Sequence, residues 1–136
     1  FIFGGGEHEK SFAEGMERRH KGVVSVIGRM SMSQEMDLIG NLDAIVTMDS
    51  ATMHIASLLG IPVVSVWGAT HPFAGFYGYG QHPDNAVQAD LPCRPCSVFG
   101  DRPCISGDYR CLSSIRPQEI ADRVAKAVAA QKSDRR

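Results

Sequence analysis

Residues 44–68 read AIVTMDSATMHIASLLGIPVVSVWG and contain two apolar runs on either side of a helical pattern. The runs 44–48 and 63–67 are nearly continuous in Val and Ile, which is typical of parallel strands covered on both faces. Between them, Ser50 can cap a helix that runs to Leu59, with Gly60 after its end and Pro62 beyond. The stretch therefore predicts a strand–helix–strand unit.

The same alternation continues towards the N-terminus. Residues 1–3 and 23–27 are short apolar runs that predict strands, and the polar stretch 7–20 is rich in helix formers. Ser31 followed three residues later by Gln34 is a capping-box pattern that opens another helix. Repeated strand–helix alternation predicts an α/β fold, with an open, doubly wound, mostly parallel sheet of Rossmann-like type.

Length and composition narrow the class of protein. The 136 residues predict a single domain over 1–136, and 43% hydrophobic residues suffice for a core. A net charge of -1 argues against nucleic acid and strongly basic membrane surfaces as partners. No apolar run approaches the ~18–20 residues of a membrane helix. Because the chain opens on Phe1 rather than Met, we expect a piece of a longer protein.

The alternation of strand and helix patterns stops between residues 69 and 114. This long, cysteine-containing insertion is rich in Gly, Pro and aromatic residues, so we expect it to be functional or internally clipped. A closing helix follows, with Pro117 in its first turn and Ile115 and Ile120 placed for a hydrophobic staple.

Ligands of open α/β sheets bind outside the carboxyl ends of the strands. The first such end, residues 4–7, holds three glycines but departs from the dinucleotide pattern G-x-G-x-x-G because Glu9 occupies the last glycine position. A tight turn accounts for these glycines equally well. A third end, with Gly68, Thr70 and His71, fits either a plain turn or a loop facing phosphate or ribose.

Of the three strand ends, the second, which follows the run 44–48, is the most informative. A helix that starts at Ser50 or Ala51 presents free N–H groups to a phosphate, and the hydroxyl of Thr52 adds a donor. Alternatively, Ser50 acts only as a helix cap, and His54 packs on the helix beside Ala51 and Leu58.

Three blocks of the chain together resemble one family. Residues 48–56 (MDSATMHIA), 59–64 (LGIPVV) and 67–72 (WGATHP) are similar to motifs of glycosyltransferase family 9, the bacterial lipopolysaccharide heptosyltransferases and their relatives. The downstream pattern Cys93-Arg94-Pro95-Cys96 with Cys104 and Cys111 also looks like many members. The resemblance covers nearly the whole chain.

The resemblance implies a GT-B fold, in which this chain is the C-terminal, donor-binding domain and faces a separate N-terminal domain. It implies an inverting, metal-independent transfer of heptose from ADP-heptose to the lipopolysaccharide inner core. The expected partners are this donor, this acceptor and the N-terminal domain, with no nucleic acid and at most peripheral membrane contact. The expected location is cytoplasmic, at the inner face of the bacterial inner membrane.

The resemblance also assigns roles to residues. Asp49 would be the catalytic acid near the donor sugar, and Ala51 stands where the family usually has Gly. The general base and a donor-binding lysine would lie outside this chain, so the isolated chain is expected to be inactive. The implied donor-binding residues are Gly5, Gly6, Met30, Ser31, Asp49, Ser50, Ala51, Thr52, His54, Gly68 and Thr70.

All four cysteines, Cys93, Cys96, Cys104 and Cys111, fall within nineteen residues. Thiolates at this density suit a structural zinc or iron clip for the loop, and some heptosyltransferase relatives hold iron in a comparable cluster. Spacing alone also allows disulfides or free thiols. No cofactor is expected to be required for transfer itself.

Two other functions fit parts of the sequence. One is another GT-B sugar-nucleotide enzyme, such as an epimerase or a transferase that uses a UDP-sugar. The other is a non-enzymatic, metal-clipped interaction module with the aromatic stretch 73–79 as its partner surface. These aromatic side chains can equally cover the edge of their own domain.

Overall fold

The computed structural model describes residues 1–134. The chain divides into two compact units, Phe1–Leu38 and Ile39–Arg136, which are described separately below. The prediction that residues 1–136 form one domain stays a prediction. Within residues 1–134, no helix has both the length and the apolar character required to cross a bilayer.

The first unit carries helix α1 (Glu7–Arg19) and most of helix α2 (Met32–Ile39). The two strands predicted here are reduced to one parallel bridge between Ile2 and Ser25. The amide of Ile2 donates to the carbonyl of Val24 at 2.8 Å, and the amide of Val26 donates to the carbonyl of Ile2 at 3.0 Å. The predicted strands are therefore wrong in extent: one bridge forms where each apolar run predicts a strand.

Polar contacts define both helix starts in this unit. The Glu9 carboxylate accepts hydrogen bonds from the amides of Gly5 (2.8 Å) and Gly6 (3.0 Å), which lower the pKa of Glu9. The capping box is confirmed, since the Ser31 amide donates to Gln34 Oε1 at 2.9 Å and the Gln34 amide to Ser31 Oγ at 3.4 Å. Helices α1 and α2 therefore begin where the local sequence patterns predict.

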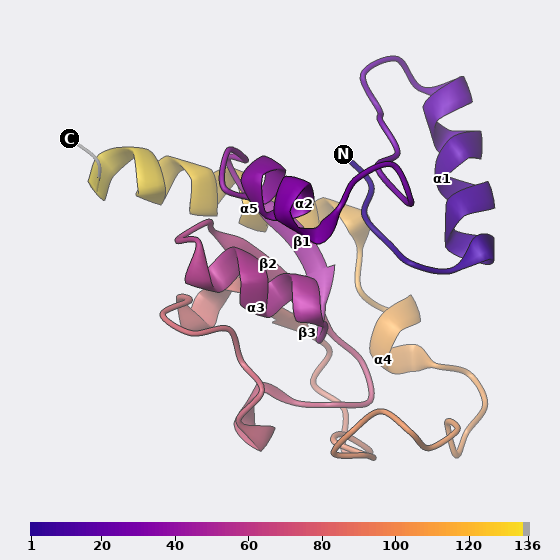
Figure 1. Ribbon diagram of the computed structural model, residues 1–136. Helices are drawn as coiled ribbons and strands as arrows, with labels where there is room; N and C mark the ends of the chain where they lie inside the picture. Colours follow the sequence, from indigo (N-terminus) through magenta and orange to yellow (C-terminus); the bar gives the residue numbers. More distant parts are fainter. Residues whose placement is uncertain (135–136) are drawn as a thin grey trace. The chain divides into compact units, whose positions relative to one another are not determined.

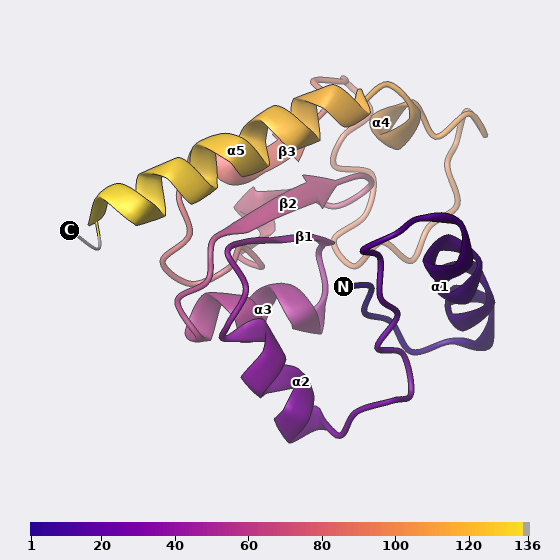
Figure 2. The same cartoon turned by 90° about the horizontal axis from the view of Figure 1, so that it is seen from above.

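The second unit is built on a three-stranded parallel sheet in the order β1-β2-β3. The strands are β1 (Ile45–Met48), β2 (Val63–Trp67) and β3 (Ala86–Gln88). Helix α3 (Ala51–Leu58) covers one face and helix α5 (Pro117–Asp134) the other, as Figures 1 and 2 show. The predicted α/β class, a parallel sheet flanked by helices on both faces, is confirmed.

The chain crosses from β1 to β2 as the sequence predicts. Ser50 is the extended N-cap of α3, and Gly60 follows the helix with φ of 71°, a left-handed conformation that favours glycine. The amide of Ile61 then donates to the carbonyl of Ala56 at 3.0 Å. This turn sets β1 and β2 in register, with Ile45 beside Val63.

One buried apolar cluster lies between β2, β3 and α5, and Val64, Val87 and Ala127 are its buried members. The predicted staple residues Ile115 and Ile120 are partly buried and pack against them, together with Val124 of α5 and Val66 of β2. Apolar burial of this kind is the main term that stabilises the unit.

The long segment after β2 contains more regular structure than the sequence predicts. It includes β3, two short 3-10 helices (Pro72–Ala74 and Pro83–Asn85) and helix α4 (Arg110–Ser113). Within the aromatic stretch, the Tyr77 hydroxyl donates to the carbonyl of His82 at 2.7 Å, while Phe73 and Tyr79 are exposed. Part of the stretch therefore covers its own unit and part faces solvent.

Trp67 is the largest fully buried side chain and ends β2 beside the candidate site. Its Nε1 donates to Ser65 Oγ at 2.8 Å, and its ring lies 6.2 Å from that of Tyr77. We expect Trp67→Ala to lower the free energy of unfolding by ~3–5 kcal/mol, as large core truncations do. Leu58→Ala, at a position 76% exposed, should change it by no more than ~0.5 kcal/mol. Urea denaturation of both variants measures this, and equal effects would contradict the assigned core.

Candidate functional site

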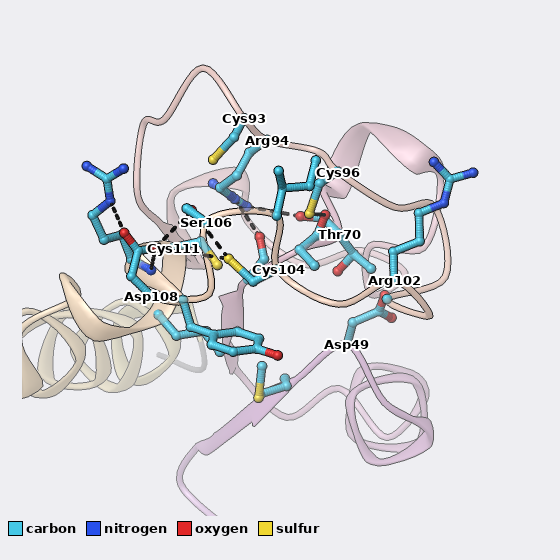
Figure 3. A pocket seen from close by; sticks show the side chains of 18 of the residues that line it. Asp49, Thr70, Cys93, Arg94, Cys96, Arg102, Cys104, Ser106, Asp108 and Cys111 are labelled. Atoms are coloured by element: carbon cyan, nitrogen blue, oxygen red, sulfur yellow. Dashed lines mark hydrogen bonds and ion pairs between the residues drawn. The ribbon is translucent and has the colours of Figure 1, made fainter.

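A cavity of about 320 Å³ lies at the carboxyl ends of β1 and β2, enclosed by the cysteine-containing loop (Figure 3). Met48 ends strand β1 and Asp49 follows it, and strand β2 is followed there by the segment 68–70. This is the edge at which open α/β sheets bind ligands. The loop side of the cavity is formed by Cys93, Arg94, Cys96, Phe99, Gly100, Arg102, Cys104, Ile105, Ser106, Asp108, Tyr109, Arg110, Cys111 and Leu112.

Asp49 stands between β1 and α3 and lines the cavity. The next residue, Ser50, caps α3 by its backbone only: its Oγ lies 2.8 Å from Thr47 Oγ1 and caps no helix N–H. No side chain therefore caps the helix start. The amide of Met53 donates to the carbonyl of Ser50 at 3.1 Å, and the N–H groups before it remain for solvent or a ligand. Ser50 is thus the N-cap residue without a side-chain cap, and like Ala51 and Thr52 it does not line the cavity; a phosphate site at this helix start stays a prediction.

Gly68 and Thr70 also line the cavity, and their donor-binding role stays a prediction. Gly68 lies close to α4: a Cβ added there would sit 3.1 Å from side-chain atoms of Leu112. Glycine at this position thus allows α4 to approach the end of β2. Nearby, His71 acts as a turn residue, because its Nδ1 accepts from the amide of Phe73 at 3.1 Å.

Arg94 connects the loop to the sheet. Its guanidinium donates to the carbonyls of Gly68 (2.5 Å), Ala89 (2.5 Å) and Thr70 (3.0 Å), and to Gln88 Oε1 (3.2 Å). Burial lowers the pKa of Arg94, but an arginine stays protonated at neutral pH. No feature of the sequence pattern predicts this role.

A second anchor of the loop is the turn before α4. Asp108 accepts from the amide of Arg110 at 3.2 Å and from Ser106 Oγ at 3.1 Å, and it forms an ion pair with the Arg110 side chain at 2.7 Å. The backbone hydrogen bond from Arg110 makes the largest contribution to lowering the pKa of Asp108. Tyr109 then starts α4 from a left-handed conformation with φ of 48°.

The four cysteines all line the cavity, and none forms a disulfide. Cys93 is exposed and Cys111 is buried. A hydrogen bond with Ser106 lowers the pKa of Cys104. Across residues 1–134, however, no three His, Cys, Asp or Glu side chains are grouped so that they could hold a metal ion. In this arrangement the thiols do not fit a metal centre, and the zinc or iron clip stays a prediction.

Several predicted site residues lie outside this cavity. Thr52 is half-buried on α3, while Ala51 and His54 are exposed there and do not line it. His54 is thus not packed away, and its donor-binding role stays a prediction. Four further candidates belong to the first unit and are considered within it: Gly5, Gly6, Met30 and Ser31.

Within the first unit, local contacts already occupy the backbone amides of three of these candidates. Gly5 and Gly6 donate to Glu9, and Ser31 donates to Gln34. Met30 is 37% exposed. These contacts favour the tight-turn interpretation of the glycines, and a nucleotide role for the four residues stays a prediction.

A family model described as "Glycosyltransferase family 9 (heptosyltransferase)" matches residues 1–104. The chain belongs to glycosyltransferase family 9. The match takes in Asp49, Gly68, Thr70 and Arg94, which meet at the cavity. The recognition made from the motifs is confirmed.

Curated members of glycosyltransferase family 9 are similar to this chain over different lengths. Lipooligosaccharide heptosyltransferase 2 of Campylobacter jejuni (serotype O:6) is 22% identical over 92% of the chain and 40% of its own length. Lipopolysaccharide heptosyltransferase 1 of Pseudomonas aeruginosa is 33% identical over 53% of the chain and 20% of its own length. Lipooligosaccharide heptosyltransferase 2 of Haemophilus influenzae is 39% identical over 36% of the chain and 14% of its own length.

The chain thus spans two fifths or less of the length of these relatives. No solved structure gives a significant match.

The sequence prediction of a zinc or iron clip is tested by elemental analysis of the purified protein. A cysteine-ligated site would retain about one equivalent of metal, since thiolate sites bind tightly. The double variant Cys93→Ser/Cys96→Ser should then lose it. A content below ~0.2 equivalents in the unaltered protein would contradict the prediction.

Proposed function

We propose that this chain forms the sugar-nucleotide-binding part of an inverting glycosyltransferase that moves heptose from ADP-heptose to the inner core of lipopolysaccharide. Membership of glycosyltransferase family 9 over residues 1–104 carries the proposal. The relatives' names, lipooligosaccharide and lipopolysaccharide heptosyltransferase, support heptose as the sugar and a lipopolysaccharide-type acceptor. We infer for such an enzyme a cytoplasmic location, at most peripherally on the inner face of the membrane.

The site chemistry agrees with this proposal. Glycosyl transfer needs a base for the acceptor hydroxyl and stabilisation of the diphosphate that leaves. The uncapped start of α3 beside Asp49 offers N–H donors for that negative charge. Three arginines and two aspartates line the cavity, so its formal charge is +1 although that of the chain is -1. The cavity therefore suits an anionic ligand.

Asp49 is assigned to the donor sugar. Its carboxylate stands at the cavity wall, next to the helix start that would receive the diphosphate. A negative group there can stabilise positive charge that develops at the anomeric carbon as the leaving group departs.

The donor is tested by binding. In the full-length protein, ADP and ADP-sugars should raise the thermal midpoint, because a ligand that binds only the folded state stabilises it. UDP and UDP-sugars should leave it unchanged. Selective stabilisation by UDP-sugars would favour the other sugar-nucleotide enzyme. Absence of stabilisation by any nucleotide, together with tight capture of a protein partner, would favour the interaction module.

Transfer activity tests Asp49 directly. We expect Asp49→Ala in the full-length enzyme to lower kcat by ~100-fold or more, the usual effect of removing a group that stabilises transition-state charge. The matched control is Asp43→Ala, which removes the same charge from an exposed position before β1. A wild-type kcat for Asp49→Ala would contradict the assignment. His54→Ala is expected to impair transfer as well, and a wild-type rate would remove it from the site.

A further inference from the structure

The loop after β3 reaches back to the end of β2 through a continuous set of hydrogen bonds. Arg94 donates to the carbonyls of Gly68 and Thr70. The carbonyl of Ala69, which lies between Gly68 and Thr70, accepts hydrogen bonds from the amides of Cys96 (3.1 Å) and Ser97 (3.4 Å). Three consecutive carbonyls after β2 thus accept hydrogen bonds from residues 94–97 alone.

The same guanidinium also holds the neighbouring strand. Its other contacts are with Gln88, the last residue of β3, and with the carbonyl of Ala89. One side chain therefore joins the carboxyl ends of two adjacent strands to the loop that encloses the cavity. Figure 3 shows Arg94 directed into the middle of this region, among Cys93, Cys111 and Thr70.

We propose that Arg94 is a positioning residue, which fixes the segment 68–70 so that Gly68 and Thr70 face a phosphate-bearing ligand in the cavity. The inference rests on the proposed function and deepens it. Four acceptors of the protein already engage the guanidinium, so Arg94 acts on the ligand through this segment rather than by contact.

The geometry of an arginine is needed for this task. The planar guanidinium spreads five N–H donors over three nitrogens, whereas a lysine has three N–H donors on one nitrogen. A lysine at position 94 has three N–H donors and cannot donate one to each of the four acceptors at the ends of β2 and β3. The Arg94→Lys variant keeps the positive charge but loses part of the hydrogen bonding to the strand ends. It therefore separates the effect of side-chain geometry from the effect of charge.

Binding of ADP and of adenosine by the full-length protein tests the inference. Isothermal titration well below the thermal midpoint measures binding to folded molecules only. The ratio of the ADP affinity to the adenosine affinity then gives the contribution of the phosphates to binding. We expect Arg94→Ala to weaken ADP binding by about tenfold or more while adenosine binding changes little, because a site depends on how its supporting residues hold it. Arg94→Lys should fall between Arg94→Ala and the unaltered protein.

Two controls address the alternatives to positioning. Val124→Ala removes core packing far along the chain and should lower the thermal midpoint without changing the ADP-to-adenosine ratio. Arg116→Ala removes one positive charge from an exposed residue outside the cavity and should also leave the ratio unchanged. A role of Arg94 in stability alone would make its variants behave like Val124→Ala.

The outcomes separate the two proposals. If the unaltered protein binds ADP and both Arg94 variants keep its ADP-to-adenosine ratio, positioning is overturned and the proposed function stands. Equal weakening of ADP and adenosine would likewise overturn it. If the unaltered protein binds no nucleotide, the proposed function fails and the inference falls with it. Should Arg94→Ala not fold, Arg94→Lys carries the comparison.

Discussion

The contact between the Arg94 guanidinium and the ends of β2 and β3 is the interaction on which the candidate site depends. Carbonyl groups at the ends of these strands have left the sheet ladder, and a buried carbonyl without a partner costs ~1–3 kcal/mol. Arg94 and the amides of Cys96 and Ser97 supply partners to the carbonyls of residues 68–70. The loop is thereby attached at the sheet edge where the cavity opens.

The remainder of the cavity wall follows from this attachment. From residue 89 to residue 109 the chain forms no helix or strand, so it cannot rely on regular backbone hydrogen bonds to hold its shape. Arg94 fixes the beginning of this stretch, and the turn at Asp108 with the buried Cys111 fixes its end. These two anchors bring all four thiols, two of which lie between them, to the same cavity without forming a ligand set in the described residues.

The sequence predicts well those features that depend on local periodicity and on helix ends. The β1–α3–β2 unit, the capping box at Ser31 and the left-handed Gly60 all have local causes that can be read directly. Asp49 and the segment 68–70 were placed at the ligand edge for the same reason. Their position follows from where the strands end.

Features that depend on distant contacts were missed. Strand β3 has three residues with one buried apolar side chain, Val87, so its pattern carries no period. Conversely, the apolar run 1–3 predicts a strand but forms one bridge, at Ile2. The role of Arg94 depends on carbonyls up to 26 residues away. Backbone acceptors leave no trace in side-chain identity, so no sequence pattern points to them.

Hydrogen exchange at the Cys96 amide tests the attachment of the loop most directly. This amide donates to the carbonyl of Ala69, and its protection reports whether the loop stays on the sheet edge. We expect slow exchange in the unaltered protein and much faster exchange in Arg94→Ala, with exchange of the Val64 amide in β2 unchanged. Equal protection of Cys96 in both proteins would contradict the claim that Arg94 holds the loop.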